Sequence, residues 1–206
     1  MKHILTAMIG ILFLAASLFR AVGEENTERV DWPSLKVAFQ IYADYPIDSN
    51  ALKVIALLPK QSHVRYTGAK EEKETIDFIY DAYELGMLER QVISGNYQAV
   101  RLAFNLIAIA DGGFAEDLDI MLGILIRINP KLFLEGLNEF HGLIGNIDGL
   151  VGNKGALYVD RLKGQCFEEK LRINALLKVR EIKLENVREE CIKVLQDQMR
   201  EYCKDF

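Results

Sequence analysis

The sequence predicts an all-α protein in which antiparallel helix pairs form one domain after an N-terminal signal peptide. Apolar residues recur at steps of three and four through most of residues 71–203, which is the spacing of one buried helix face. Residues that start and stop helices divide this pattern, among them Gly95, Asn96 and the pair Asn129 and Pro130. The connections between the expected helices are short, and short connections make consecutive helices pack antiparallel.

Residues 1–23 have the three parts of a secretory signal peptide. A basic start precedes an uncharged apolar run at 4–19, whose 16 residues fall short of the roughly 20 that a membrane-spanning helix needs. The small residues Ala21 and Gly23 suit cleavage after residue 23. We therefore expect a periplasmic or secreted protein whose mature part, residues 24–206, is a single helical domain without stable membrane insertion. An uncleaved membrane anchor is the alternative.

Two short helices are expected before the regular part of the pattern. A proline in the first turn favours a helix over residues 33–44, and Pro59 ends a second helix over 50–58. Both stretches contain β-branched residues, so residues 35–42 could form a strand instead.

The helical array at residues 31–141 continues with four longer helices. These are expected over residues 71–93, 96–110, 114–128 and 130–141. Their starting positions give a two-helix unit of about 35–43 residues, within the range of helical repeats. The pattern resembles a short HEAT-like α-solenoid in its helical-repeat architecture, without any family-specific motif. This resemblance implies stacked helix pairs over at most residues 71–203, and an irregular helical bundle is the alternative.

A glycine-rich run at residues 142–155 interrupts the helical pattern with five glycines. Its spacing matches neither nucleotide-binding fingerprint, so it does not indicate a phosphate-binding loop. We expect a mobile loop between helices, and long loops inside compact domains are often functional. The run therefore supplies a possible interaction edge, formed by Gly145, Asn146, Asp148, Asn153 and Lys154.

A C-terminal helix pair is expected within residues 156–206, with a short helix near 158–162 and long helices over 167–180 and 183–203. Residues 160–206 contain 11 basic and 10 acidic residues, and their interleaving at helical spacing is typical of a solvated helix face.

Three cysteines lie in this C-terminal part, and an exported protein can form disulfides. Cys191 and Cys203 share one expected helix, where 12 residues at 1.5 Å each separate them by about 18 Å, beyond the roughly 7 Å that a disulfide spans. An antiparallel turn near residues 181–183 brings Cys166 closer to Cys203 than to Cys191. We therefore predict a Cys166–Cys203 disulfide with Cys191 buried as a free thiol. Three unpaired thiols are the alternative.

The other residues that could form a metal or catalytic site have simpler structural explanations. Residues 111–119 contain four carboxylates beside a glycine turn, which could hold calcium, but the spacing is not that of an EF-hand. Acids at a helix start are explained by capping and by the helix dipole. His63 and His141 belong to no zinc-binding pattern, and no serine lies in a nucleophile elbow. We expect no metal, no cofactor and no catalytic residue.

Aromatic residues gather in the N-terminal half of the chain. A groove lined by them could bind a peptide or a glycan, although core or rim positions explain most of them. They are Trp32, Tyr42, Tyr45, Tyr66, Tyr80 and Tyr83.

The net charge and the lack of a catalytic motif in the sequence limit the possible classes of function. The net charge is −5, and cleavage would make it −7 by removing Lys2 and Arg20. Nucleic-acid binding needs a clustered cationic face, so we do not expect it. We expect a non-catalytic module that presents a helical surface to a protein partner. The alternatives are a periplasmic hydrolase that uses scattered acids with His63 or His141, and a small-ligand carrier with an apolar pocket between helices.

Overall fold

The computed structural model describes residues 30–60, 67–145, 147–154 and 162–203. Within these residues the chain forms ten α-helices and no strand, so the all-α prediction is confirmed. Three short 3₁₀ helices, η1 (Ile107–Ile109), η2 (His141–Leu143) and η4 (Ile182–Leu184), accompany them. The α-helices are α2 (Trp32–Asp44), α3 (Asp48–Leu57), α4 (Lys70–Ile79), α5 (Ala82–Ile93), α6 (Tyr97–Leu106), α7 (Gly112–Ile128), α8 (Pro130–Phe140), α9 (Ile147–Gly152), α10 (Leu162–Leu176) and α11 (Glu185–Tyr202).

Two expectations at the N-terminus have different outcomes. The strand alternative for residues 35–42 is wrong, because this stretch lies inside α2, where Leu35 and Phe39 are buried one helical turn apart. The signal peptide at residues 1–23 lies outside the described residues, as do residues 158–161 of the expected short helix. In the part of the chain that the structure describes, no helix combines the length and the apolarity needed to cross a membrane.

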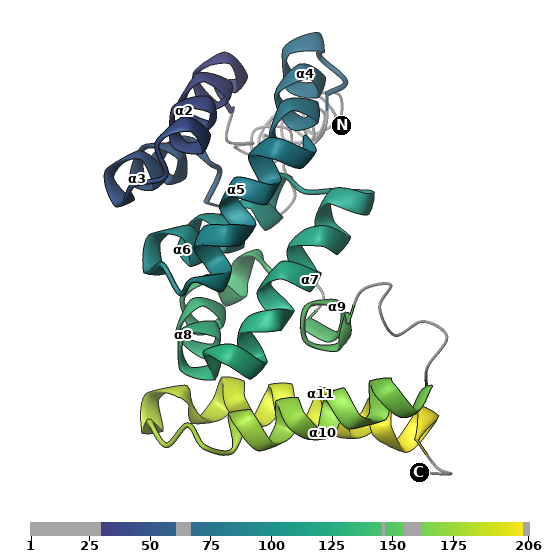
Figure 1. Cartoon of the computed structure of the whole chain (residues 1–206). Helices are drawn as coiled ribbons and strands as arrows, with labels where there is room; N and C mark the ends of the chain where they lie inside the picture. The colour runs from purple at the N-terminus through teal and green to yellow at the C-terminus, as the bar shows by residue number, and fades with distance from the viewer. Residues whose placement is uncertain (1–29, 61–66, 146, 155–161, 204–206) are drawn as a thin grey trace, which may run out of the picture.

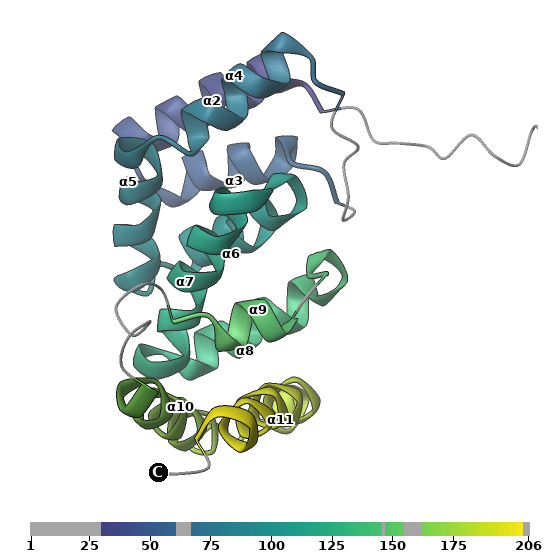
Figure 2. The same cartoon turned by 90° about the vertical axis from the view of Figure 1, so that its right-hand side faces the viewer.

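The helices stack in one direction, from α2, α3 and α4 at one end to α10 and α11 at the other (Figures 1 and 2). Helix α2 packs on α3 and α4, α3 packs on α6, and α6 packs on α8. Helices α10 and α11 pack on each other and against α7, α8 and α9. The predicted C-terminal pair corresponds to α10 and α11, but α10 begins and ends earlier than expected.

The core is centred on α6, which has seven buried residues among its ten. Its Phe104 side chain is fully buried, and its ring centroid lies 6.1 Å from those of Phe133 and Phe140 on α8. Gly136 faces the Phe104 ring, and a Cβ atom there would overlap it. The close approach of α6 and α8 therefore depends on this glycine.

The helix expected over residues 71–93 is two helices, α4 and α5, separated at Tyr80 and Asp81. The Asp81 side chain caps α5 by accepting a hydrogen bond from the Tyr83 N–H at 3.0 Å. An aspartate that offers this bond to the backbone favours a helix start over a helix interior. The predicted stop at Gly95 is present, because Gly95 takes a left-handed φ of 82° after α5.

The loop expected over residues 142–155 is wrong in its central part, because Ile147–Gly152 forms α9. Leu150 and Val151 are fully buried, and α9 packs against α7 and α11. Burial of these two side chains outweighs the poor helix propensity of the glycines around them. Part of the glycine-rich run therefore belongs to the hydrophobic core, and deleting it should destabilise the fold.

Candidate functional site

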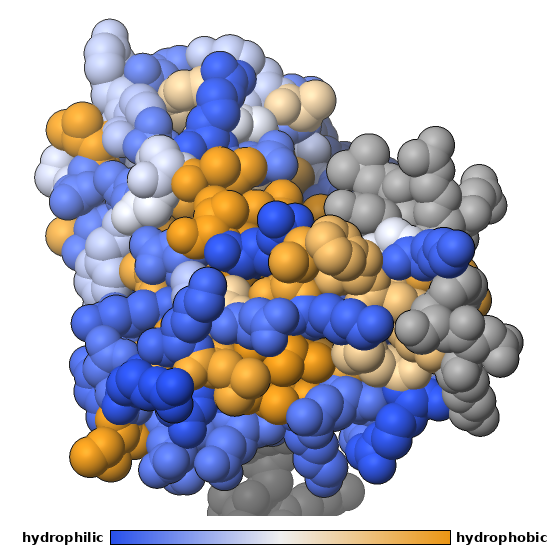
Figure 3. Space-filling view, turned by 60° about the horizontal axis from the view of Figure 1, so that its bottom comes forward, coloured by the Kyte–Doolittle hydropathy of each residue, from blue (hydrophilic) through white to orange (hydrophobic). Residues whose placement is uncertain are grey.

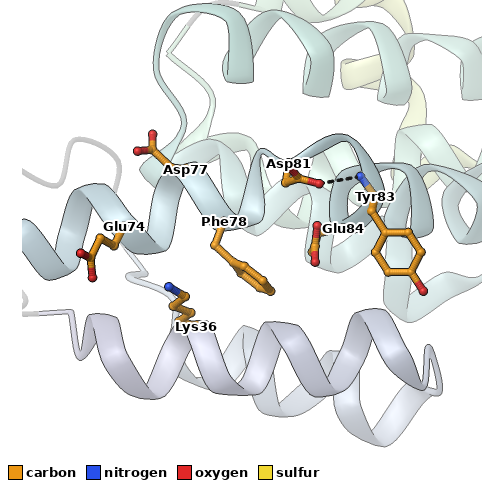
Figure 4. A pocket seen from close by; sticks show the side chains of 7 residues that line it. All are labelled: Lys36, Glu74, Asp77, Phe78, Asp81, Tyr83 and Glu84. Carbon is orange, nitrogen blue, oxygen red and sulfur yellow. Dashed lines mark hydrogen bonds between the residues drawn. The ribbon is translucent and has the colours of Figure 1, made fainter.

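A groove lies between α2 and the segment formed by α4 and α5 (Figure 4). It has a volume of about 580 Å³ and is open to solvent. In Figure 4, Lys36 points from α2 toward α4, and Phe78 and Glu84 point from α4 and α5 toward α2. The lining residues are Lys36, Glu74, Asp77, Phe78, Asp81, Tyr83 and Glu84.

The packing of α4 on α2 places these side chains. Thr75 and Ile79 form part of the buried side of α4, and the Thr75 hydroxyl donates a hydrogen bond to the Trp32 carbonyl on α2 at 3.1 Å. Glu74 and Asp77 are exposed on the same helix. The break at Asp81 then turns the chain so that α5 adds Glu84 to the groove.

The groove is acidic. Among the described residues, four carboxylates line it against one ammonium group, which leaves an excess of negative charge. The Lys36 ammonium nitrogen lies 5.4 Å from the centre of the Phe78 ring, close enough for a cation–π contact. The groove therefore already holds one cation of the chain on an aromatic face.

The pKa of Glu84 is affected by burial and by its acidic neighbours. Burial raises the pKa of Glu84, its own backbone N–H partly offsets this effect, and the charges of Asp81 and Asp44 raise the pKa further. Each added negative charge makes ionisation of the next carboxyl less favourable. A cation that entered the groove would relieve this repulsion.

The aromatic residues expected to gather in the N-terminal half are divided among several positions. Tyr42 is buried, whereas Tyr45 and Tyr83 are 68% and 53% exposed. The Tyr80 ring packs on Phe114 with a centroid distance of 5.5 Å. Of these residues Tyr83 lines the groove, Trp32 is half-buried, and Tyr66 lies outside the described residues.

Phe78 and the acidic residues of the groove were not predicted as a site from the sequence. The available signal was the spacing of Glu74, Asp77, Asp81 and Glu84, which recur at steps of three and four. In a single continuous helix this spacing is equally typical of a solvated face, so it does not distinguish a groove from ordinary surface.

The edge expected in the glycine-rich run is not one continuous surface. Gly145 and Asp148 are exposed, Asn146 lies outside the described residues, and Asn153 and Lys154 are half-buried. The edge therefore stays a prediction, and Asn153 and Lys154 also take part in a polar network that joins α7, α9, α10 and α11.

Lys154 and Arg172 hold the C-terminal end of α9 in this network. The Lys154 ammonium donates to Glu169 Oε1 at 2.7 Å and to the Gly152 carbonyl at 2.9 Å. The Arg172 guanidinium donates to the carbonyls of Val151 at 2.7 Å and Asn153 at 3.2 Å. Carbonyl groups at a helix C-terminus lack helical partners, and these cations supply the missing donors.

Glu168 completes the network by linking α10 to α7. It accepts hydrogen bonds from Arg172 Nε at 3.2 Å and from Arg127 Nη1 at 2.8 Å. Glu168 and Arg172 are 5% and 3% exposed, so their charges are compensated inside the protein. The network therefore has a structural role, with its charged groups already paired.

The cysteines take the arrangement that the sequence predicts. Cys166 and Cys203 are joined, with their Cα atoms 5.9 Å apart, so the start of α10 is tied to the end of α11. Cys191 is a buried free thiol, and burial together with Glu190 raises its pKa to about 12. Such a thiol is protonated at neutral pH and is a poor nucleophile.

The acidic turn at residues 111–119 differs from the capping that we expected. Asp111 occupies the N-cap position of α7, but its side chain makes no capping hydrogen bond. Burial, with a smaller effect of Glu116, raises the pKa of Asp119 to about 6. Among the described residues, no three His, Cys, Asp or Glu side chains are arranged to hold a metal ion.

The histidines lie apart from the groove or outside the described residues. His141 follows α8, and its Nε2 atom lies 3.3 Å from Glu190 Oε2 on α11. His63 is not among the described residues.

No protein-family model matches the chain, and neither a curated protein nor a solved structure matches it. Its function must therefore be inferred from the groove and the surfaces around it.

Proposed function

We propose that this protein is a non-catalytic helical interaction module that binds a positively charged segment of a protein partner in the groove between α2 and α4–α5. One observation carries this proposal: within the described part of the chain, four carboxylates, two aromatic rings and one ammonium group line an open groove. Export to the periplasm or the medium remains the expectation for where this binding takes place.

The groove has the chemistry that arginine or lysine side chains require. Carboxylates pair with both cations, and aromatic rings such as Phe78 and Tyr83 stack well on the flat arginine guanidinium. Attraction between exposed charges weakens as salt rises, so binding in this groove should be salt-dependent.

The two alternative functions have less support. A small-ligand carrier needs an enclosed apolar pocket, whereas this groove is open and lined by charged groups. In a hydrolase, the Glu84 carboxyl, whose pKa is raised, would need a second catalytic group beside it. Asp81 is engaged in capping α5, however, and His141 pairs with Glu190.

The HEAT-like α-solenoid remains a prediction about the architecture. The stacking of the helices in one direction supports it, because each helix layer of a solenoid contacts mainly its neighbours (Figure 2). The irregularly placed short helix α9 instead suits the bundle alternative.

A fluorescent hexa-arginine peptide tests the proposal directly. Its binding, followed by fluorescence anisotropy, should be saturable at low salt and should weaken steeply as salt is added. Glu74→Lys should weaken binding by about tenfold or more, since it reverses one charge in the groove. Glu74 is exposed and its surface ion pair with Lys70, at 3.5 Å, contributes little stability, so the variant should fold.

Glu189→Lys is the matched control, because it makes the same substitution at an exposed position of α11. This variant should bind the peptide within about twofold of the wild type, as expected for a charge remote from the site. Equal weakening by both variants would show a general attraction between a basic peptide and an acidic protein, and it would refute the groove as the site.

A further inference from the structure

The outer face of α10 is basic and carries exposed apolar side chains. Every exposed charged residue between residues 162 and 180 is basic, because Glu168 and Glu169 turn inward into the buried network. Phe167 is 64% exposed, and Lys170, one helical turn later, is exposed on the same side of the helix.

At this end of the molecule the described residues expose apolar side chains as well as polar ones. Figure 3 shows apolar surface between rows of hydrophilic side chains on this side of the molecule. Leu177 and Ile182, which follow α10, are 46% and 87% exposed. Terminal helices of stacked-helix proteins normally present a polar outer face, so exposed apolar side chains here indicate a contact surface.

The opposite end of the stack carries the complementary chemistry. Beside the acidic groove, α2 exposes Val37 and Ile41, which lie four residues apart and are 57% and 43% exposed. Val37 directly follows the groove residue Lys36 in α2, so the apolar stripe begins beside the groove. This end is therefore acidic and apolar, whereas α10 is basic and apolar.

The two surfaces cannot meet within one molecule, because α2 and α4 lie at one end of the stack and α10 lies at the other (Figure 2). Building on the proposed function, we propose that the partner is a second copy of this chain, whose α10 docks against the acidic groove and the α2 stripe. Phe167 packs against Val37 and Ile41, and Lys170 faces the groove carboxylates.

A contact of this kind joins two different surfaces, so a pair of molecules still has one groove and one α10 unoccupied. Repetition produces a head-to-tail chain or a closed ring instead of a symmetric dimer. The contact area of one helix face is small, so the assembly is weak and depends on concentration and salt.

Sedimentation of the purified whole protein at low salt tests this assembly. The average mass should rise with concentration and return to that of the monomer at high salt. Glu74→Lys reverses one charge of the acidic surface, and Lys170→Glu reverses one charge of the basic surface. The self-association of each variant should therefore be weaker by about tenfold or more. The controls Glu189→Lys and Lys193→Glu make the same two charge changes on exposed positions of α11 and should assemble like the wild type.

Mixing the two variants tests whether the groove of one molecule contacts α10 of another. The Lys170→Glu protein keeps an intact groove, and the Glu74→Lys protein keeps an intact α10, so an equal mixture should form a dimer and nothing larger. A dimer of the wild type that never grows would overturn the proposal, and so would assembly that both variants leave unchanged.

A wild type that stays monomeric at every concentration would also overturn the second-copy partner. If that monomer still binds hexa-arginine with sensitivity to Glu74→Lys, the groove function stands and only the identity of the partner is refuted. If it binds neither the peptide nor itself, both proposals are refuted.

Discussion

Two identical substitutions at helical glycines should have opposite effects on stability. Gly86 lies in α5, and a Cβ atom there would meet no other atom within 4 Å, so Gly86→Ala should stabilise the protein by about 0.5–1 kcal/mol through helix propensity. Gly136 lies in α8 against the Phe104 ring, which is held between Phe133 and Phe140. Overpacking there costs about 1–3 kcal/mol and exceeds the same propensity gain, which leaves a net loss of about 1–2 kcal/mol.

Urea unfolding followed by circular dichroism measures both effects. The midpoint should shift upward for Gly86→Ala and downward for Gly136→Ala, with the slope unchanged in each case. The expected difference between the variants is about 1.5–3 kcal/mol. If Gly136→Ala were as stabilising as Gly86→Ala, the close packing of α6 on α8 described above would be refuted.

Three further predictions concern the disulfide, the half-buried Asp119 and the buried network. Replacing Cys166 and Cys203 by alanine opens a bridge of sequence separation 37 and should cost about 4 kcal/mol in urea unfolding; a linked peptide containing Cys191 in non-reducing mapping would contradict the helix register. The raised folded pKa of Asp119, about 6, means that its contribution to stability is present below about pH 4 and is lost as pH rises to 6. Asp119→Asn should therefore be about 1–2 kcal/mol more stable than the wild type at pH 7, after allowance for partial exposure, and no more stable at pH 4. Lys154→Met leaves the Glu169 carboxylate, whose side chain is 3% exposed, without its cation and should cost about 3 kcal/mol, and the double variant with Glu169→Leu should recover most of that loss.

The prediction of the disulfide succeeded in choosing Cys166 and Cys203 because it used only local geometry. The rise of a helix separates Cys191 from Cys203, and an antiparallel hairpin with a short turn places Cys166 near Cys203. The same local rules located most helices, since periodic apolar residues and capping residues act within a few positions of the chain. The break between α4 and α5 was missed because apolar periodicity continues through Asp81, although that residue starts a new helix.

The sequence by itself determined the helical character of the chain, most of its helix positions and the pairing of its cysteines. The tertiary structure alone decided α9, the role of Lys154 and the groove. Helix α9 forms because Leu150 and Val151 are buried against α7 and α11 and because Arg172 and Lys154 hold its last carbonyls, contacts that no local pattern contains. The groove brings Lys36 close to carboxylates of α4 and α5, far along the chain, because α4 packs on α2. Helix formation follows from interactions between near neighbours in the sequence, whereas burial and charge clustering depend on which distant helices come into contact.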